Sequence, residues 1–284
     1  MSDADFAPRQ AEVDVAGVRT RYLEAGSGRP VVFIHGFGAV GAYWRWTLGA
    51  LPPGFRGIAP DLVGHGESGV TQGPYDAGYY EKLLMGFLDA LEVDKTVLVG
   101  NSMGGLLAAR LAIDHPARVE RLVLCDSIGL NRGLPWSTRL MYLRSFLKGL
   151  FRPPSMESAR EWLAEATFHD SSRITEEFLD LSPRSRRTLE ARMAMIKTAI
   201  GLLRPEARVL NRLGEIRAPT LLVWGADDRQ FPASDAREAA KRIPLCRLEI
   251  IDRCGHIPMV ERPEEFNRIL NEFLGQEFTG TKPK

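Results

Sequence analysis

The chain has little of the material that several classes of protein require. Its three cysteines, Cys125, Cys246 and Cys254, are too few and too scattered for a disulfide framework or a set of zinc ligands. Lysine and arginine number 37 against 36 aspartate and glutamate, and a net charge of +1 gives no indication of a nucleic-acid partner. No run of about 18 apolar residues occurs, so we expect no membrane insertion.

The amino terminus lacks a targeting pattern. Residues 1–8 are acidic and polar, without the apolar region of a secretory signal. Together with the low cysteine content, this favours a cytoplasmic protein in a reducing compartment. The expected partner is a small molecule, and a homodimer is one alternative for the oligomeric state.

Short apolar runs alternate with helical patterns along most of the chain. A hairpin is expected at residues 11–18 and 19–25, and buried strands at 31–34, 56–59, 96–99, 122–124, 220–224 and 247–251. Apolar residues spaced three and four apart predict a helix at 77–91, with Asp76 as its cap, and proline in the first turn marks another at 263–274. This alternation is typical of an α/β domain.

Residues 131–212 interrupt the alternation with helical, arginine-rich sequence. Prolines divide this stretch into several short helices, at positions Pro135, Pro153, Pro154, Pro183 and Pro205. We interpret it as a helical cap inserted after the sixth strand. The core is then expected to comprise residues 1–130 and 213–275, and residues 276–284 are expected to form a flexible tail.

The pentapeptide Gly100-Asn101-Ser102-Met103-Gly104 directly follows the strand expected at 96–99. A serine that projects from a tight turn between a strand and a helix has strained backbone angles, and small neighbours let the flanking chain pass closely. This pattern predicts a nucleophile elbow with Ser102 as the nucleophile.

A base and an acid are expected later in the chain, in the order serine, acid, histidine. Of the five histidines, His256 alone follows the last expected strand, so we predict it as the base. The turn after residues 220–224 offers Asp227 and Asp228, and we predict Asp228 as the acid because 28 residues then leave room for one helix and one strand. Asp126, after the preceding strand, is a substitute acid.

The loop His35-Gly36-Phe37-Gly38 follows the strand at 31–34 and is the candidate oxyanion loop. We assign the two oxyanion donors to the backbone N–H groups of Phe37 and Met103, and to His35 a structural role. The candidate substrate-binding residues are Gly36, Gly38, Trp136, Phe168 and Ile257. This chemistry requires no metal and no cofactor.

Two other classes of function compete with an enzyme of this kind. Residues 36–41 formally fit the dinucleotide fingerprint, with Asp61 twenty residues after Gly41. Two β-type runs precede this loop, however, and a dinucleotide site leaves Ser102 and His256 without a role. A binding protein that keeps the pocket but has lost turnover is the second alternative.

Over residues 11–274 the chain resembles the α/β-hydrolase family. The residues that carry this resemblance are the elbow, the two later loops and the segment from Asp61 to Ser68. It implies an eight-stranded, mostly parallel sheet flanked by helices. Serine at position 102 argues against the haloalkane dehalogenases and epoxide hydrolases of that family, which use aspartate there.

Within the family, the chain is similar to the meta-cleavage-product hydrolases, which split carbon–carbon bonds. The shared features are Gly100 to Gly105, Cys254-Gly255-His256 and the phrase at 170–177. Three residues depart from that branch and remove the expected anchors of a dienol carboxylate: Ile257 replaces a tryptophan, Ser182 a lid arginine and Phe37 a small residue. Substitute anchors are available at Arg184, Arg186 and Arg187. We therefore predict a serine carboxylesterase acting on small, largely apolar esters, with the carbon–carbon hydrolase as the alternative.

Overall fold

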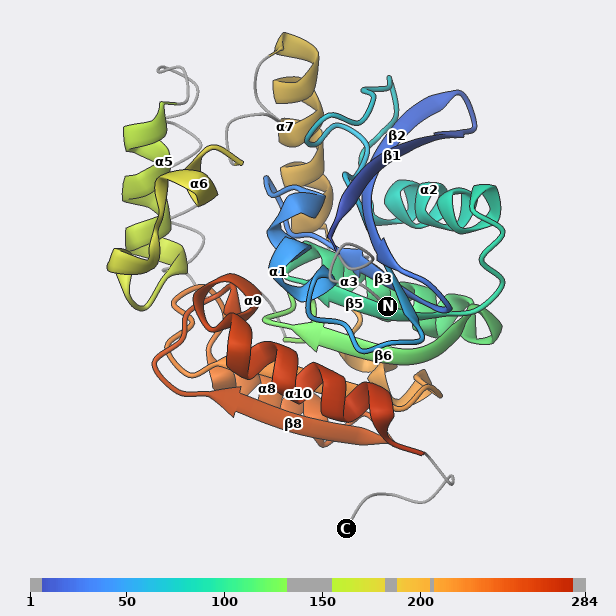
Figure 1. The fold of residues 1–284 in the computed structure, drawn as a ribbon, viewed down its shortest axis with the longest axis vertical. Coiled ribbons are helices and arrows are strands. Elements are labelled where there is room, and N and C mark those ends of the chain that lie inside the picture. The colour runs from blue at the N-terminus through green and yellow to red at the C-terminus, as the bar shows by residue number, and fades with distance from the viewer. Residues whose placement is uncertain (1–6, 132–154, 182–187, 205–206, 278–284) are drawn as a thin grey trace.

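The computed structural model describes residues 7–131, 155–181, 188–204 and 207–277 (Figure 1). Eight strands form one sheet in the order β1-β2-β4-β3-β5-β6-β7-β8. Their bounds are β1 Arg9–Val15, β2 Val18–Gly26, β3 Arg29–Ile34, β4 Phe55–Pro60, β5 Thr96–Asn101, β6 Val119–Cys125, β7 Thr220–Gly225 and β8 Cys246–Ile251. β2 pairs antiparallel with β1 and with β4, and the other neighbouring strands are parallel. The predicted mostly parallel sheet of eight strands is therefore confirmed.

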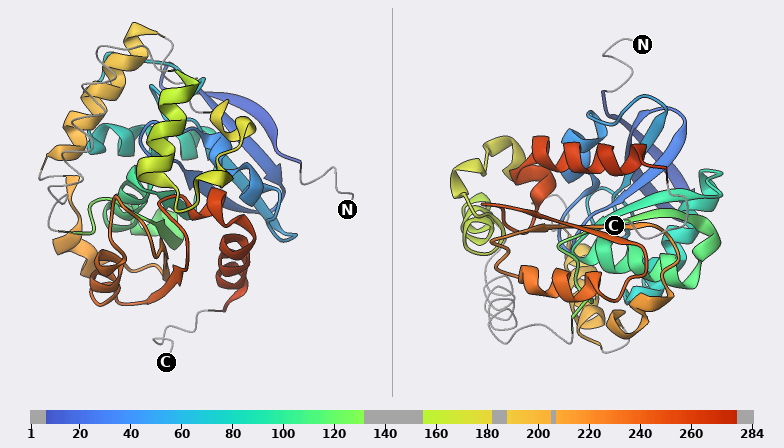
Figure 2. Two further views of the ribbon diagram at one scale, coloured as in Figure 1. Left: turned by 90° about the vertical axis from the view of Figure 1, so that its left-hand side faces the viewer. Right: turned by 90° about the horizontal axis from the view of Figure 1, so that it is seen from below.

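Side chains alternate between the two faces of the sheet, as the two-residue period of a strand requires. In β3, Val31 and Phe33 belong to one apolar core, and Val32 and Ile34 belong to the other. Helices α2 (Ala77–Ala90), α3 (Met103–Asp114) and α8 (Ala233–Ala240) pack on one face. Helices α1 (Arg45–Leu48), α9 (Pro258–Glu261) and α10 (Pro263–Gly275) pack on the other (Figure 2). This covering of both faces explains why the parallel strands are continuous apolar runs.

The predicted helix boundaries have local causes. Asp76 caps α2, and its side chain accepts a hydrogen bond from the N–H of Tyr79 at 2.9 Å. Pro263 occupies the first position of α10, where its missing N–H costs nothing. Both helices begin where the sequence patterns indicate.

Between β6 and β7, the described residues form several short helices. These are α5 (Met156–Trp162), the π-helical turn η4 (Leu163–Thr167), the 3-10 turn η5 (Ser171–Arg173), α6 (Glu176–Leu179), α7 (Leu189–Leu203) and the 3-10 turn η8 (Leu210–Glu215). Trp136, Ser182, Arg184, Arg186 and Arg187 lie outside the described residues. The predicted cap borders at 131 and 212 stay a prediction. Among the residues described, no helix combines the length and apolar character needed to span a bilayer.

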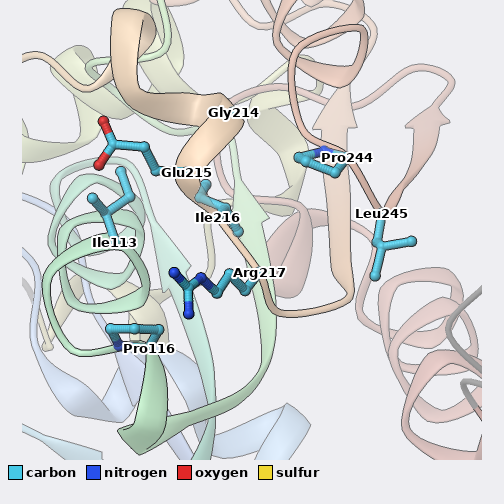
Figure 3. A pocket seen from close by; sticks show the side chains of 8 residues that line it. All are labelled: Ile113, Pro116, Gly214, Glu215, Ile216, Arg217, Pro244 and Leu245. Atoms are coloured by element: carbon cyan, nitrogen blue, oxygen red, sulfur yellow. The ribbon is translucent and has the colours of Figure 1, made fainter.

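The described residues form a surface hollow of about 550 Å³ (Figure 3). It is lined by Ile113, Pro116, Gly214, Glu215, Ile216, Arg217, Pro244 and Leu245. These residues precede β6, β7 and β8 and therefore lie at the amino ends of the parallel strands. Ser102 follows the carboxyl end of β5, at the opposite edge of the sheet. We assign the hollow no part in the chemistry of Ser102.

Candidate active site

Ser102 lies in the sharp turn between β5 and α3 and has φ 56° and ψ −116°. A non-glycine residue with this backbone conformation is strained, as a nucleophile elbow requires. The chain passes so closely that a Cβ on Gly104 would lie 2.1 Å from the carbonyl oxygen of Ile34. A Cβ on Gly100 would lie 2.2 Å from the carbonyl oxygen of Gly104. Glycine is therefore required on both sides of the serine, as the sequence indicates.

His256 and Asp228 are hydrogen-bonded to each other in the loops that follow β8 and β7. Nδ1 of His256 lies 2.9 Å from Oδ2 of Asp228, whose side chain is completely buried. Oδ1 of Asp228 accepts the N–H groups of Gln230 at 2.8 Å and Phe231 at 3.2 Å. The carboxylate is thus held on Nδ1, which leaves Nε2 of His256 to act as a base.

The two other candidate acids have different partners. Oδ2 of Asp227 lies 3.0 Å from Nδ1 of His169, and both side chains are partly exposed. Oδ1 of Asp126 accepts the N–H of Gly225 at 2.9 Å. The structure thus places Asp228, the acid predicted from spacing, on the imidazole of His256. The catalytic roles of Ser102, Asp228 and His256 stay predictions that this geometry supports.

A buried histidine fixes the loop that follows β3. Nδ1 of His35 donates to the carbonyl oxygen of Gly36 at 2.8 Å, and Nε2 accepts the N–H of Leu62 at 3.0 Å. Burial lowers the pKa of His35 to about 4, so the imidazole is neutral at neutral pH. The expected structural role of His35 agrees with these contacts.

The loop fixed by His35 lies against the nucleophile. A Cβ on Gly36 would lie 3.1 Å from Cβ of Ser102. Gly38 has φ +71°, a conformation that favours glycine. Met103 begins α3, where the first N–H groups of a helix have no partner within the helix. The assignment of the oxyanion donors to Phe37 and Met103 stays a prediction that this close approach supports.

Asp61 ties together the loop that resembles a dinucleotide fingerprint. Its Oδ1 accepts the N–H of Gly41 at 2.7 Å, and its Oδ2 accepts the N–H of Glu67 at 2.9 Å. Both carboxylate oxygens therefore bind backbone of this chain. The spacing from Gly41 to Asp61 has a structural cause, and no dinucleotide is needed to explain it.

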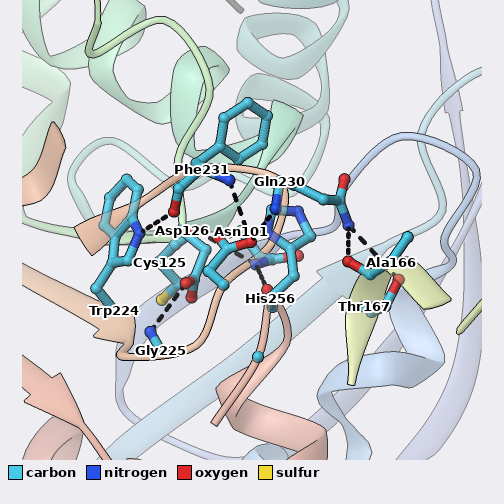
Figure 4. A network of polar contacts seen from close by, with 12 residues as sticks. Asn101, Cys125, Asp126, Ala166, Thr167, Trp224, Gly225, Gln230, Phe231 and His256 are labelled. Atoms are coloured by element: carbon cyan, nitrogen blue, oxygen red, sulfur yellow. Dashed lines mark hydrogen bonds and ion pairs between the residues drawn. The ribbon is translucent and has the colours of Figure 1, made fainter. Parts of the chain in front are cut away.

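The π-helical turn η4 and the residues after it contact the loops that carry the proposed acid and base. The N–H of His256 donates to the carbonyl oxygen of Thr167 at 2.7 Å. Nε2 of Gln230 donates to the carbonyl oxygen of Ala166 at 3.2 Å (Figure 4). Asn101, beside the nucleophile, donates through Nδ2 to the carbonyl oxygen of His256 at 3.0 Å. These bonds join the elbow, the histidine loop and the segment between β6 and β7 into one network.

Glu261 in α9 secures the same junction, and sequence reasoning missed it. Its buried carboxylate accepts the N–H groups of Gly255 at 2.7 Å, Asp170 at 2.7 Å and His169 at 3.2 Å. The only signal in the sequence is a glutamate five residues after His256, which is too weak to indicate a role.

The candidate pocket residues differ in their surroundings. Phe168 is 1% exposed and packs edge-on against Phe178, with ring centroids 5.6 Å apart. Ile257 is buried, and the half-buried ring of Phe37 lies 6.3 Å from that of His65. Trp136 lies outside the described residues. Substrate contact at these positions stays a prediction.

Comparison with known proteins decides the family. Residues 31–269 match the sequence profile of the alpha/beta hydrolase family. The chain belongs to the α/β-hydrolase family.

Relatives of this hydrolase match it over nearly its whole length. The 2-hydroxy-6-oxo-6-phenylhexa-2,4-dienoate hydrolase of Comamonas testosteroni is 31% identical over 272 residues and covers 94% of each chain. The 2-hydroxy-6-oxo-2,4-heptadienoate hydrolase of Pseudomonas putida is 32% identical over 279 residues, which is 92% of this chain and 94% of the relative. The solved meta-cleavage product hydrolase of Pseudomonas fluorescens IP01 has a TM-score of 0.79 and 28% identity, and covers 93% of this chain and 97% of that chain.

The prediction of a carboxylic ester hydrolase is wrong. The relatives are named as dienoate hydrolases and meta-cleavage product hydrolases, which matches the alternative stated from the sequence. The error came from giving three positions, Phe37, Ser182 and Ile257, more weight than the similarity of the whole chain. The dinucleotide hypothesis is also wrong, because the matched family is one of hydrolases.

Proposed function

We propose that this hydrolase cleaves the carbon–carbon bond beside the ketone of a 2-hydroxy-6-oxo-2,4-dienoate. One observation carries the proposal: relatives with that type of substrate in their names match more than nine-tenths of the chain. The elbow at Ser102 and the bond between His256 and Asp228 supply the nucleophile and the base that such a hydrolysis needs.

Cleavage of a carbon–carbon bond requires a leaving carbon that can accept an electron pair. In a 2-hydroxy-6-oxo-2,4-dienoate, transfer of a proton from the C2 hydroxyl to C5 leaves ketones at C2 and C6 with a double bond between C3 and C4. When the bond between C5 and C6 breaks, its electron pair moves through that double bond to the oxygen on C2. The substrate thus contains its own electron acceptor, and no metal or organic cofactor enters the scheme.

Ser102, His256 and Asp228 then act as a serine, a base and an acid do in serine hydrolases. Ser102 attacks C6 while Nε2 of His256 takes its proton, and Asp228 stabilises the imidazolium. The N–H groups of Phe37 and Met103 stabilise the negative charge that develops on the C6 oxygen. After the dienolate leaves and takes up a proton, water attacks the acyl group on Ser102 and releases the carboxylic acid. Overall, water supplies a hydroxyl to the acid and a proton to the dienol.

The test is hydrolysis of 2-hydroxy-6-oxo-6-phenylhexa-2,4-dienoate by the purified chain. We expect the dienoate absorbance to disappear, with benzoate and 2-hydroxypenta-2,4-dienoate formed in equal amounts by chromatography. Ser102→Ala should lower the rate by about 10³-fold or more. No loss of absorbance from protein whose Ser102 still reacts with a fluorophosphonate would overturn the proposal.

A further inference from the structure

Asp126 is a second buried carboxyl group beside the pair formed by Asp228 and His256. It follows β6 directly, is 0% exposed and has φ 45°. Its Oδ1 accepts the N–H of Gly225 at 2.9 Å, whereas its Oδ2 has no hydrogen-bond partner among the described residues. A buried oxygen without a partner is costly, so its surroundings need an explanation.

The carboxyl group of Asp228, which lies close to that of Asp126, is another acceptor. Ligand-type atoms of Asp126, Asp228 and His256 all lie within 4.8 Å of one another. Figure 4 shows Asp126 between the strand end at Cys125 and the loop of Gln230. Two ionised carboxylates cannot hydrogen-bond to each other, and in a buried site they repel. One proton between them turns this repulsion into a hydrogen bond.

The contacts of the two carboxyl groups decide which one holds the proton. Asp228 accepts two backbone N–H groups and binds the imidazole of His256, and all three contacts favour its ionised form. Asp126 accepts a single N–H group. The ionised form is therefore much better stabilised at Asp228 than at Asp126.

We propose that Asp126 carries a proton and donates it through Oδ2 to the carboxylate of Asp228, and so acts as a positioning residue for the acid that orients His256. The inference rests on the proposed roles of Asp228 and His256, and it is independent of which substrate the hydrolase cleaves.

The charges around Asp126 agree with a protonated carboxyl. Burial raises the pKa of Asp126 well above its usual range, and the nearby carboxylates of Asp228 and Glu261 raise it further. Burial also raises the pKa of the two neighbouring thiols, Cys125 and Cys254, so both remain uncharged. The remaining titratable group at this point is the imidazole of His256, which pairs with Asp228. The surroundings of Asp126 are thus mainly neutral or negative.

Asp126→Asn tests the proposal because the amide reproduces a protonated carboxyl. Its oxygen can accept the N–H of Gly225, its NH₂ can donate to Asp228, and asparagine tolerates a positive φ. The readout is the rate at which a fluorophosphonate labels Ser102 between pH 4 and pH 9. Labelling requires a neutral His256, so the acidic limb of the profile reports the pKa of His256.

We expect the midpoint of that limb in Asp126→Asn to stay within about 0.3 units of the original protein, because no charge is removed. We expect Asp126→Ala, which lacks the donor, to be labelled about tenfold more slowly at pH 7, as for other groups that orient a functional residue. Asp227→Asn is the matched control for loss of a neighbouring, partly exposed charge, and should also leave the midpoint in place.

Two outcomes would overturn the proposal. A midpoint lowered by one unit or more in Asp126→Asn means that an ionised Asp126 stabilises the imidazolium in the original protein. Equal labelling rates for Asp126→Ala and the original protein mean that no positioning hydrogen bond exists. Should the alanine variant fail to fold, carboxyl ¹³C NMR of aspartate-labelled protein decides between the two. The resonance that disappears in Asp126→Asn belongs to Asp126, and in the original protein it must have the chemical shift of a protonated carboxyl at pH 7. Because the fluorophosphonate needs no dienoate, a negative dienoate assay leaves this test intact.

Discussion

The N–H of His256 donates to the carbonyl oxygen of Thr167 at 2.7 Å, which joins the proposed catalytic base to the segment between β6 and β7. The approach is so close that a Cβ on Gly255 would lie 2.1 Å from the same oxygen. The histidine loop and the segment between β6 and β7 are therefore in direct backbone contact at this point. Substitutions in the segment between β6 and β7 should therefore affect the position of His256 through these backbone contacts.

Glu261→Ala should destabilise the junction between these segments. The substitution leaves the buried N–H of Gly255 without its acceptor, and it also removes the acceptor of the less buried N–H groups of Asp170 and His169. We expect a loss of about 3 kcal/mol in the free energy of unfolding, measured by urea denaturation, together with a lower kcat. Glu264→Ala, in the exposed first turn of α10, should change stability by only about 0.5 kcal/mol. Equal losses in the two variants would contradict this role of Glu261.

Gly104→Ala should prevent the elbow from forming as it does here. The added Cβ would lie 2.1 Å from the carbonyl oxygen of Ile34, a backbone atom that cannot move aside. We expect a loss of about 3 kcal/mol or more, and no labelling of Ser102 by a fluorophosphonate. Gly275→Ala has no atom within 4 Å of its Cβ and should be neutral or slightly stabilising. A stable, fully labelled Gly104→Ala protein would disprove the packing argument.

Stability should fall with pH between about 6.5 and 4 because of His35. The folded protein keeps this imidazole neutral, with a pKa of about 4, whereas the unfolded chain takes up a proton near pH 6.5. The unfolded state therefore binds more protons in this range, and the free energy of unfolding should drop by about 3 kcal/mol. His35→Gln should remove this part of the slope in denaturation curves measured from pH 7 to pH 4. An unchanged slope would show that another group is responsible.

Asp228→Asn should lower kcat by about 10³-fold to 10⁴-fold, because the amide no longer fixes the imidazole in the reactive tautomer. Asp227→Asn, one residue earlier and paired with His169, should lower kcat less than twofold. Steady-state rates on one dienoate measure both effects. A larger loss of kcat for Asp227→Asn than for Asp228→Asn would identify Asp227, and not Asp228, as the acid.

Much of the fold could be predicted because its signals are local. The apolar run of β5, the elbow after it and the Asp76 cap of α2 all depend on neighbouring residues. The turn after β7 could be singled out for the predicted acid because the chain from there to His256 must accommodate one helix and one strand. These constraints are visible in a single sequence.

The rest depends on contacts between segments that are far apart in the chain. Glu261 binds residues 91 and 92 positions away, and Asp126 meets a loop about 100 residues later. No pattern along the sequence predicts either contact. The choice between an ester and a carbon–carbon bond depends on how the leaving group is held. The departures at Phe37, Ser182 and Ile257 predicted the wrong bond, whereas the relatives that match 92–94% of the chain are named as dienoate hydrolases.

The most direct test compares two substrates that deliver the same benzoyl group to Ser102. One is 2-hydroxy-6-oxo-6-phenylhexa-2,4-dienoate, and the other is p-nitrophenyl benzoate, whose leaving group departs through oxygen. For a carbon–carbon hydrolase, kcat/KM for the dienoate should exceed that for the ester by about 100-fold or more, and Ser102→Ala should abolish both activities. A higher kcat/KM for the ester, with no cleavage of the dienoate, would contradict the account.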